Sequence, residues 1–276
     1  MNLLLIESDE LDEHGRVTLG DRRAEHLARV LKVDVDTRLR AGLIGGGRGS
    51  AVVEDLDISK SSGPGSKKKT VAVTLRVEID SQAPPRPELD LVIGLPRPAV
   101  LHRVLQHAAA IGVGRLDLIN AWRVEKSFFQ SPALKPAAIR RHLLLGLEQG
   151  QQTWLPEVHI HHRLVPFVEA LPTSAADECR LIAHPGADAA IEDALDGSAQ
   201  RFLLAIGPEG GWIDRELETF AAAGFTAAAL GPWILRSEAA VTAAVAQIAV
   251  LRRLEQRRRT SRVTNQRKDG VRSAHR

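Results

Sequence analysis

Two patterns of apolar and polar positions divide the chain. Up to about residue 80, short apolar runs alternate with turn residues, and residues 71–79 alternate with a period of two. Such alternation is typical of strands with one buried face, so residues 1–80 are predicted to form a small β-barrel or half-barrel domain. One helix interrupts this pattern at residues 21–33, where apolar residues recur at helical spacing. The predicted strands are residues 3–6, 37–43, 51–56 and 71–79.

Beyond residues 81–88, where Pro84, Pro85 and Pro87 stiffen a linker, strand-like and helical patterns alternate. This alternation predicts an α/β domain on a mainly parallel sheet over residues 88–256. Parallel sheets bind ligands at the carboxyl ends of their strands, so we expect the chemistry in the loops that leave those ends. The predicted strands are residues 89–93, 115–119, 180–184, 202–206 and 225–230, and the predicted helices are residues 98–111, 136–148, 188–195, 214–223 and 238–257.

The charge distribution adds a basic tail to this picture. The formal net charge is only +3, yet residues 251–276 hold ten basic residues against two acidic ones. A basic segment that is poor in apolar residues cannot form a core, so residues 257–276 are predicted to be a disordered tail. Its charge suits a polyanion such as RNA, and a tail that only aids solubility is the alternative.

Several classes of protein are excluded by what the sequence lacks. No window approaches the run of about eighteen apolar residues that spans a membrane, and the N-terminus lacks the basic start of a signal peptide. Cys179 is the only cysteine, which excludes an internal disulfide and a thiolate metal cluster. The histidines at residues 159, 161 and 162 lie in a strand-like context and are interpreted as a solvated face. We therefore expect a cytoplasmic protein without a metal and without a membrane partner.

The first informative loop follows the strand at residues 202–206 and reads Gly-Pro-Glu-Gly-Gly-Trp over residues 207–212. Glycines let a ligand approach the backbone N–H groups closely. An acid, Glu209, stands where a phosphate-binding loop would need a lysine or bare N–H groups. The loop therefore favours a polar or cationic ligand over an anionic one, with a tight strand-to-helix connection as the alternative.

The second loop, residues 230–238, is apolar for a surface segment, with a tryptophan, an isoleucine and a leucine in succession at residues 233–235. We expect these side chains to line a pocket or to pack under one. Arg236 and Glu238 then stand at the start of the following helix. Arg236 is the candidate catalytic residue, and a structural ion pair with Glu238 or Glu209 is its alternative role.

These two loops resemble the signature of the RsmE family, the ribosomal RNA small-subunit uridine-N3 methyltransferases of the SPOUT superfamily. Their strings read Gly207-Pro208-Glu209-Gly210-Gly211 and Leu230-Gly231-x-x-Ile234-Leu235-Arg236-x-Glu238. Other strings match the family in the expected order over about residues 15–255. These are His26-Leu27-x-Arg29-Val30-Leu31-Lys32, Gly94-Leu95-Pro96-Arg97, Arg123-Val124-Glu125-Lys126-Ser127 and Glu148-Gln149.

The resemblance implies a fold and a cofactor. It implies an α/β protein in which a SPOUT-type, trefoil-knotted parallel-sheet domain follows a small PUA-like β-barrel domain that binds RNA, and it implies a homodimer. It also implies that S-adenosylmethionine binds, bent, among three loops at residues 184–186, 207–211 and 230–236. The cofactor-binding residues that it assigns are His184, Gly207, Glu209, Gly210, Leu230, Gly231, Ile234, Leu235 and Arg236.

The implied reaction is methylation of a specific uridine of 16S ribosomal RNA at N3. Uracil N3 must lose its proton to attack, so a cation such as Arg236 would stabilise the developing charge. The base must be unpaired or extruded, because its pairing edge is occupied in a duplex. The substrate is expected to be naked RNA or the assembled 30S particle. The residues expected to bind it are Arg29, Lys32, Arg97, Arg123 and Lys126.

Two alternatives to this reading of the function remain open. An arginine usually follows Glu148-Gln149 within three residues in the family, whereas this chain has Gly150-Gln151-Gln152. That difference motivates the first alternative, an RNA-binding ribosome assembly protein without catalysis. The second is a SPOUT methyltransferase that acts on another RNA site.

Overall fold

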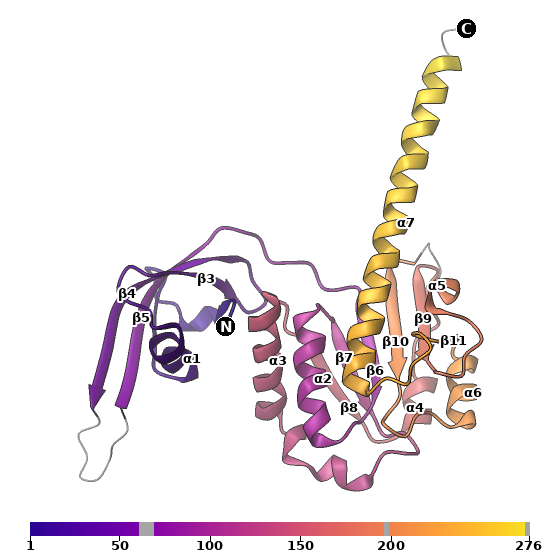
Figure 1. Ribbon diagram of the computed structural model, residues 1–276, viewed down its shortest axis with the longest axis horizontal. Coiled ribbons are helices and arrows are strands. Elements are labelled where there is room, and N and C mark those ends of the chain that lie inside the picture. Colours follow the sequence, from indigo (N-terminus) through magenta and orange to yellow (C-terminus); the bar gives the residue numbers. More distant parts are fainter. Residues whose placement is uncertain (61–68, 196–198, 274–276) are drawn as a thin grey trace. The chain divides into compact units, whose positions relative to one another are not determined.

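The computed structural model describes residues 1–60, 69–195 and 199–273 (Figure 1). The chain divides into two compact units. The first segment of the first unit ends within the predicted linker at residues 81–88, but two later segments also belong to that unit. The first unit comprises Met1–Pro87, Leu105–Gly114 and Lys135–Glu157, and the second comprises Glu88–Val104, Arg115–Leu134 and Val158–Arg276.

A five-stranded sheet surrounds the apolar core of the first unit. In the order β1-β3-β4-β5-β2, strands β1 and β3 pair in parallel and the other neighbours are antiparallel. The alternation seen in the sequence becomes a buried face, because Val71, Val73, Leu75 and Val77 all point into the core. The sheet fits the predicted barrel-like domain. The strands are β1 (Leu4–Ile6), β2 (Arg16–Leu19), β3 (Arg38–Leu43), β4 (Arg48–Lys60) and β5 (Lys69–Ile79).

The helix predicted at residues 21–33 is confirmed and has two parts. Asp21 caps α1 (Arg22–His26), since its carboxylate accepts a hydrogen bond from the backbone N–H two residues further on at 2.8 Å. A wider turn, η2 (Leu27–Leu31), follows, and the chain leaves it at Lys32 with a left-handed φ of 52°. Because this turn ends the helix, the residues after it turn back toward the sheet.

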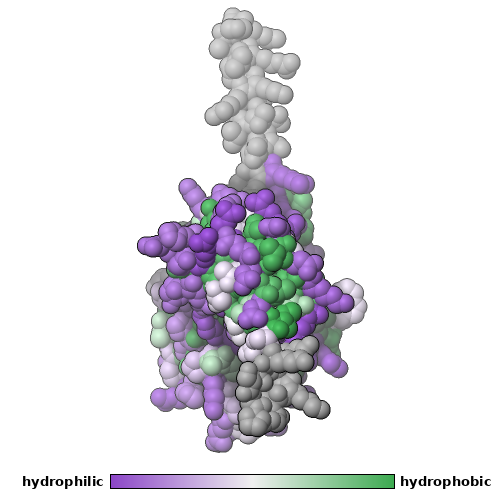
Figure 2. Space-filling view, turned by 90° about the vertical axis from the view of Figure 1, so that its left-hand side faces the viewer, coloured by the Kyte–Doolittle hydropathy of each residue, from purple (hydrophilic) through white to green (hydrophobic). Residues whose placement is uncertain are grey.

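Exposed apolar side chains occur on the first unit beside exposed cations. Figure 2 shows an apolar patch bordered by hydrophilic residues. Arg29 and Lys32, which are expected to bind RNA, are also exposed. The exposed large apolar residues of the described part of this unit are Val30, Leu31, Val35 and Ile58.

Helix α3 (Pro136–Gly150) belongs to the first unit, although the sequence places it within the second predicted domain, residues 88–256. The backbone carbonyl of Glu148 accepts hydrogen bonds from the N–H groups of residues 2 and 3 at 3.2 and 3.1 Å. The buried carboxylate of Glu148 also pairs with Arg22 at 2.5 Å. The chain therefore passes between the two units at more places than the linker. Contacts with residues far away in sequence join α3 to the N-terminal segment.

An ion pair in the first unit makes its stability depend on pH. Arg23 donates to both carboxylate oxygens of Glu10, and the backbone N–H of Glu7 donates to the same group at 2.9 Å. The hydrogen bond from Arg23 is the main cause that holds the pKa of Glu10 below its ordinary value of 4.5. A lowered carboxylate pKa stabilises the fold above that ordinary value, and the stabilisation is lost as the pH falls through the folded pKa.

We expect Glu10→Gln to lower the thermal unfolding midpoint at neutral pH by about 2–4 °C, for a loss of roughly 1 kcal/mol. The difference from wild type should shrink as the pH falls below 4.5, because the wild-type carboxylate then becomes protonated too. Scanning calorimetry at neutral pH and at about pH 3 measures both differences. Asp9→Asn, at an exposed neighbouring position, is the control. A difference that stays the same at both pH values would contradict the prediction.

A six-stranded sheet in the order β11-β9-β10-β6-β7-β8 organises the second unit (Figure 1). The pairs β11–β9, β9–β10, β10–β6 and β6–β7 are parallel. Strands β6 and β10 are central and almost entirely buried, which explains their continuous apolar runs. The predicted α/β fold on a parallel sheet is confirmed. The strands are β6 (Leu89–Gly94), β7 (Arg115–Ile119), β8 (Glu157–His161), β9 (Glu178–Ala183), β10 (Arg201–Ile206) and β11 (Thr226–Ala228).

Apart from the length of the last one, the predicted helices lie close to their expected positions. Strand β2 and helix α4 were not predicted, because segments of four and six residues span too few periods to stand out. Short turns η1 (Ser8–Glu10), η3 (Lys126–Gln130) and η4 (Pro132–Leu134) add to the connections. The remaining helices are α2 (Pro98–Ala110), α4 (Leu164–Glu169), α5 (Ile191–Ala194), α6 (Asp214–Ala222) and α7 (Ser237–Ser273).

The segment predicted to be a disordered tail, residues 257–276, is instead helical as far as the structure describes it. Helix α7 continues to Ser273, and residues 274–276 lie outside the described residues. The sequence between residues 251 and 273 has no proline and is rich in arginine, a good helix former. Helix formation does not need a core, so a lack of apolar residues did not exclude it. None of the described helices is both long and apolar enough to cross a membrane.

Candidate functional site

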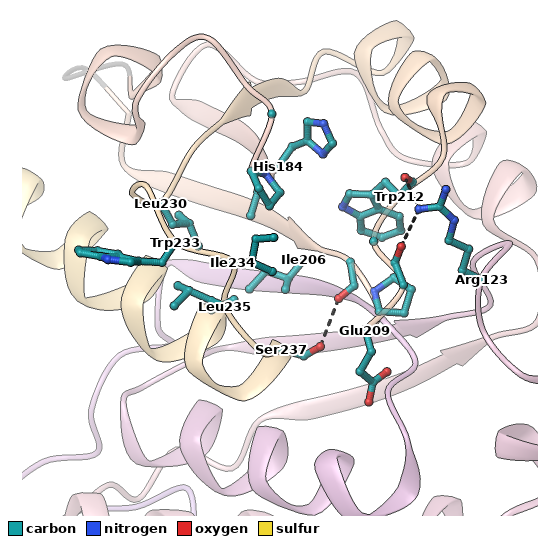
Figure 3. Close-up of a pocket in the computed structure, with 18 residues that line it drawn as sticks. Arg123, His184, Ile206, Glu209, Trp212, Leu230, Trp233, Ile234, Leu235 and Ser237 are labelled. Carbon is teal, nitrogen blue, oxygen red and sulfur yellow. Dashed lines mark hydrogen bonds between the residues drawn. The ribbon is translucent and has the colours of Figure 1, made fainter.

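Three loops that follow neighbouring strands enclose a cavity of about 460 Å³ in the second unit (Figure 3). They leave the carboxyl ends of β9, β10 and β11, which are adjacent in the sheet. Parallel sheets bind ligands at this edge. The structure thus brings together the two loops identified in the sequence and the loop after β9. The lining residues are Arg123, Ala183, His184, Pro185, Gly186, Ile206, Gly207, Pro208, Glu209, Gly210, Gly211, Trp212, Leu230, Trp233, Ile234, Leu235, Ser237 and Ala240.

Seven of the nine residues predicted to bind the cofactor line this cavity, and Gly231 and Arg236 do not. Gly231 affects the conformation of the loop through its backbone. Its φ of 137° lies in a region that favours glycine, and a Cβ there would lie 2.8 Å from the ring of Trp233. Gly231 therefore shapes the loop after β11, while its neighbours face the cavity.

The loop after β11 forms the apolar side of the cavity. Figure 3 shows Leu230, Ile234 and Leu235 around one space, with Ile206 on the other side of it. Ile234 is 88% exposed, so its side chain stands at the open mouth of the cavity. Covering such a side chain with a flat apolar group removes apolar surface from water. This side of the cavity is suited to an aromatic ring such as a purine.

The glycine-rich loop after β10 is held from two sides. The Arg123 guanidinium donates to the carbonyl oxygen of Gly210 at 2.6 Å, and the Ser237 hydroxyl donates to that of Gly207 at 3.4 Å. Gly211 has a left-handed φ of 72° and closes a turn by donating to the carbonyl of Pro208 at 2.8 Å. The loop is therefore positioned by contacts that exist without a ligand.

The carboxylate of Glu209 is bound by Arg97. Its carboxylate accepts a hydrogen bond from the backbone N–H of Arg97 at 3.1 Å and lies 3.5 Å from the Arg97 Nε. In Figure 3 its carboxylate points away from the apolar side chains of the cavity. Because Arg97 compensates its charge, Glu209 does not select against anionic ligands as the sequence suggested.

Arg236 makes no ion pair with either acid of its alternative role, although its charge helps to lower the pKa of Glu238. Glu238 pairs with Arg103 at 3.1 Å, and Glu209 is bound by Arg97. Burial would raise the pKa of Glu238, but hydrogen bonds from its own backbone and from Arg103 outweigh burial and lower it. The Arg236 side chain is exposed, one residue beyond the lining Leu235. Within the described part of the chain, both acids proposed as its partners are bound by other arginines.

Trp212 is a residue of the cavity wall that the sequence analysis did not select. Its side chain is 4% exposed and packs edge-on against Phe220, with ring centroids 5.1 Å apart. Its indole Nε1 is buried and has no hydrogen-bond partner among the described residues. A buried donor without a partner is costly. An aromatic residue after a glycine pair looks like a core residue in the sequence, and only its place in the cavity distinguishes it.

The cations expected to bind RNA occupy different settings. Arg97 and Arg123 already bind Glu209 and the glycine-rich loop, whereas Lys126 is exposed. Arg29 and Lys32 are exposed on the first unit. The described residues contain no group of three or more His, Cys, Asp or Glu side chains placed to hold a metal ion.

Comparison with known proteins gives consistent results over most of the chain. A sequence profile of the RNA methyltransferase domain matches residues 83–249. The ribosomal RNA small subunit methyltransferase E of Treponema pallidum (strain Nichols) is 31% identical over 259 residues, which are 90% of each chain. The ribosomal RNA small subunit methyltransferase E 1 of Borreliella burgdorferi is 25% identical over 244 residues, 88% of this chain and 95% of the relative.

A solved structure shares the fold. The ribosomal RNA small subunit methyltransferase E from Neisseria gonorrhoeae, bound to S-adenosyl methionine, superposes with a TM-score of 0.71 at 22% identity. The match covers 91% of this chain and 98% of the other. The likeness therefore supports the fold described above.

Proposed function

This chain belongs to the RNA methyltransferase family, and on that basis we propose that it transfers the methyl group of S-adenosylmethionine to N3 of a uridine in 16S ribosomal RNA. The observation that carries the proposal is the cavity at the carboxyl ends of β9, β10 and β11. The relatives named as small-subunit ribosomal RNA methyltransferases support the choice of RNA. The RsmE resemblance supports the choice of uridine N3.

The residues of the cavity fit this cofactor. Leu230, Ile234 and Leu235 offer an apolar slot for the adenine, and the glycine-rich loop leaves room for close approach. The unpartnered indole N–H of Trp212 offers a donor for a cofactor or substrate oxygen. When bound, S-adenosylmethionine supplies an electrophilic methyl group on a sulfonium.

The chain contributes to the reaction in two ways: it positions the base against the methyl group, and it stabilises the negative charge that forms on the base. Methyl transfer is an in-line displacement, so holding the base nitrogen against the methyl carbon supplies much of the acceleration. The uracil N3 proton passes to solvent, which leaves the base anionic, and the exposed guanidinium of Arg236 stabilises that charge. Arg236 is suited to this role because its side chain is exposed and because other arginines bind the two nearby acids.

The finer features of the family complete the proposal. The first unit would bind RNA through Arg29 and Lys32, so affinity should weaken steeply as salt is raised. The second unit would have the trefoil-knotted SPOUT topology and form a homodimer with its active site near the interface. The substrate would be 16S RNA in the cytoplasm, either naked or within the 30S particle.

Mass mapping of ribosomal RNA from a deletion strain tests the assignment. The proposal expects one uridine of 16S RNA to lose a methyl group in the deletion strain and to regain it when the wild-type gene is returned. Unchanged small-subunit RNA would remove the uridine assignment and leave the fold intact. Calorimetric titration with S-adenosylmethionine is the complementary measurement. Failure to saturate would favour an assembly protein without catalysis.

A further inference from the structure

A second hollow lies beside the cofactor cavity in the second unit. This groove, of about 700 Å³, forms where the loop after β7 meets the starts of α4 and α6. Trp122 belongs to its lining and is 80% exposed, so nearly a whole indole ring faces water. An aromatic ring of this size gains free energy when another surface covers it.

The backbone that carries this indole is fixed. The backbone N–H of Trp122 donates to one carboxylate oxygen of Glu216 at 2.7 Å, and that of Ile213 donates to the other at 3.0 Å. Glu216 is 6% exposed, so its charge joins the loop to α6 and contributes little to the open surface. The indole is thus presented on a rigid support before anything binds.

The groove has a strongly basic character. Lys126, Arg163 and Arg215 line it and are exposed, and His162 lies beside them. None of the three cations forms an ion pair within the described part of the chain. Glu216 is the one acid among the lining residues, all of which are described. The groove therefore combines an exposed aromatic ring with uncompensated positive charge.

The groove and the cofactor cavity share a wall. Arg123 and Trp212 line the cavity, while their chain neighbours Trp122 and Ile213 line the groove. A strand whose target base enters the cavity must place adjacent nucleotides on the neighbouring surface, because consecutive nucleotides are covalently linked. The groove is the basic, aromatic part of that surface.

We propose that this groove binds an unpaired nucleotide next to the methylated one, with its base stacked on Trp122 and its phosphate held by Lys126, Arg163 and Arg215. The inference rests on the proposed RNA substrate. Bases of single strands stack on aromatic side chains, and cations track the phosphates. Charge complementarity favours RNA over a protein occupant, because three exposed cations and one buried acid line the groove and a phosphate backbone carries negative charge only.

The test compares Trp122→Ala with Trp122→Phe, which keeps an aromatic surface. We expect Trp122→Ala to weaken binding of a short fluorescent oligouridylate by about tenfold, the size of one base–aromatic stack, and Trp122→Phe to retain most of it. With unmethylated small ribosomal subunits as substrate, the same loss should appear mainly in KM. Affinity for S-adenosylmethionine and the molecular mass by light scattering should not change.

A charge pair of variants checks the second half of the inference. Arg163→Glu should bind the oligouridylate more weakly than the wild type does. The difference in affinity should grow as the salt concentration is lowered, because the variant has lost a phosphate contact. Arg201→Glu is the control for a charge reversal outside the groove, since Arg201 is an exposed arginine at the amino end of β10, where it pairs with Asp177 at 3.2 Å. Equal losses in the two variants would overturn the assignment of the groove.

The outcomes separate this inference from the proposed function. Oligonucleotide binding that is unaffected by Trp122→Ala would overturn it, and so would a loss of dimer mass in that variant, which would mark the groove as a protein interface. Trp122-dependent binding without methylation of ribosomal subunits would support the groove and remove the uridine assignment. A wild-type protein that binds S-adenosylmethionine but no RNA would overturn both.

Discussion

Replacing Arg236 with alanine is expected to lower the turnover of methyl transfer by about a hundredfold or more, the size of losing a charge stabiliser at a reacting centre. Affinity for S-adenosylmethionine should stay within about tenfold, because the Arg236 side chain does not line the cavity. Turnover is expected to fall because other arginines bind the two nearby acids, so the exposed guanidinium of Arg236 can contact the substrate. Single-turnover kinetics and calorimetric titration measure the two quantities separately.

Arg236→Lys provides the matched control, because it keeps the charge but not the planar guanidinium. It should recover part of the lost turnover. Wild-type turnover in Arg236→Ala would remove this residue from the mechanism. A loss of cofactor affinity as large as the loss of turnover would instead indicate that Arg236 holds the cofactor.

Gly94→Ala is expected to weaken S-adenosylmethionine binding by about thirtyfold, although residue 94 does not line the cavity. A Cβ on Gly94 would lie 2.4 Å from the Cδ of Pro208 and 2.7 Å from its backbone nitrogen. Neither atom belongs to a flexible side chain, so the added methyl group must move the glycine-rich loop at a cost of about 2 kcal/mol. Calorimetric titration of the purified variant measures the affinity.

Gly20→Ala is the control for this substitution, because no atom lies within 4 Å of the Cβ that it adds. It should bind S-adenosylmethionine as the wild type does. Gly94→Ala that unfolds at the wild-type temperature but binds the cofactor weakly would support a local displacement of the loop. Unchanged affinity would show that the close approach of β6 to Pro208 does not position the binding loop.

The sequence was sufficient for the elements that carry a long or regular pattern. The central strands β6 and β10 are buried on both faces, so their residues are almost all apolar and stand out in the chain. Strand β2 and helix α4 were missed because segments of four and six residues show little periodicity. The two loops that bound the cavity were found because glycine, proline and exposed apolar residues are unusual at strand ends.

The partners of charged side chains could not be predicted in the same way. Glu209 was assigned to the ligand and Arg97 to RNA, yet the structure pairs them across 112 positions of sequence. Which of several arginines reaches a carboxylate depends on distances in space, and the interaction energy falls off over a few ångströms. A list of acidic and basic residues does not contain those distances.

The sequence by itself determined the α/β class, the barrel-like N-terminal sheet and the loops that form the cavity, because periodicity and turn chemistry are local properties of the chain. Only the tertiary structure decided that α3 joins the first unit and that Arg123 holds the glycine-rich loop. It alone placed the exposed indole of Trp122 beside uncompensated cations. These features depend on contacts between segments far apart in sequence, which folding brings within bonding distance.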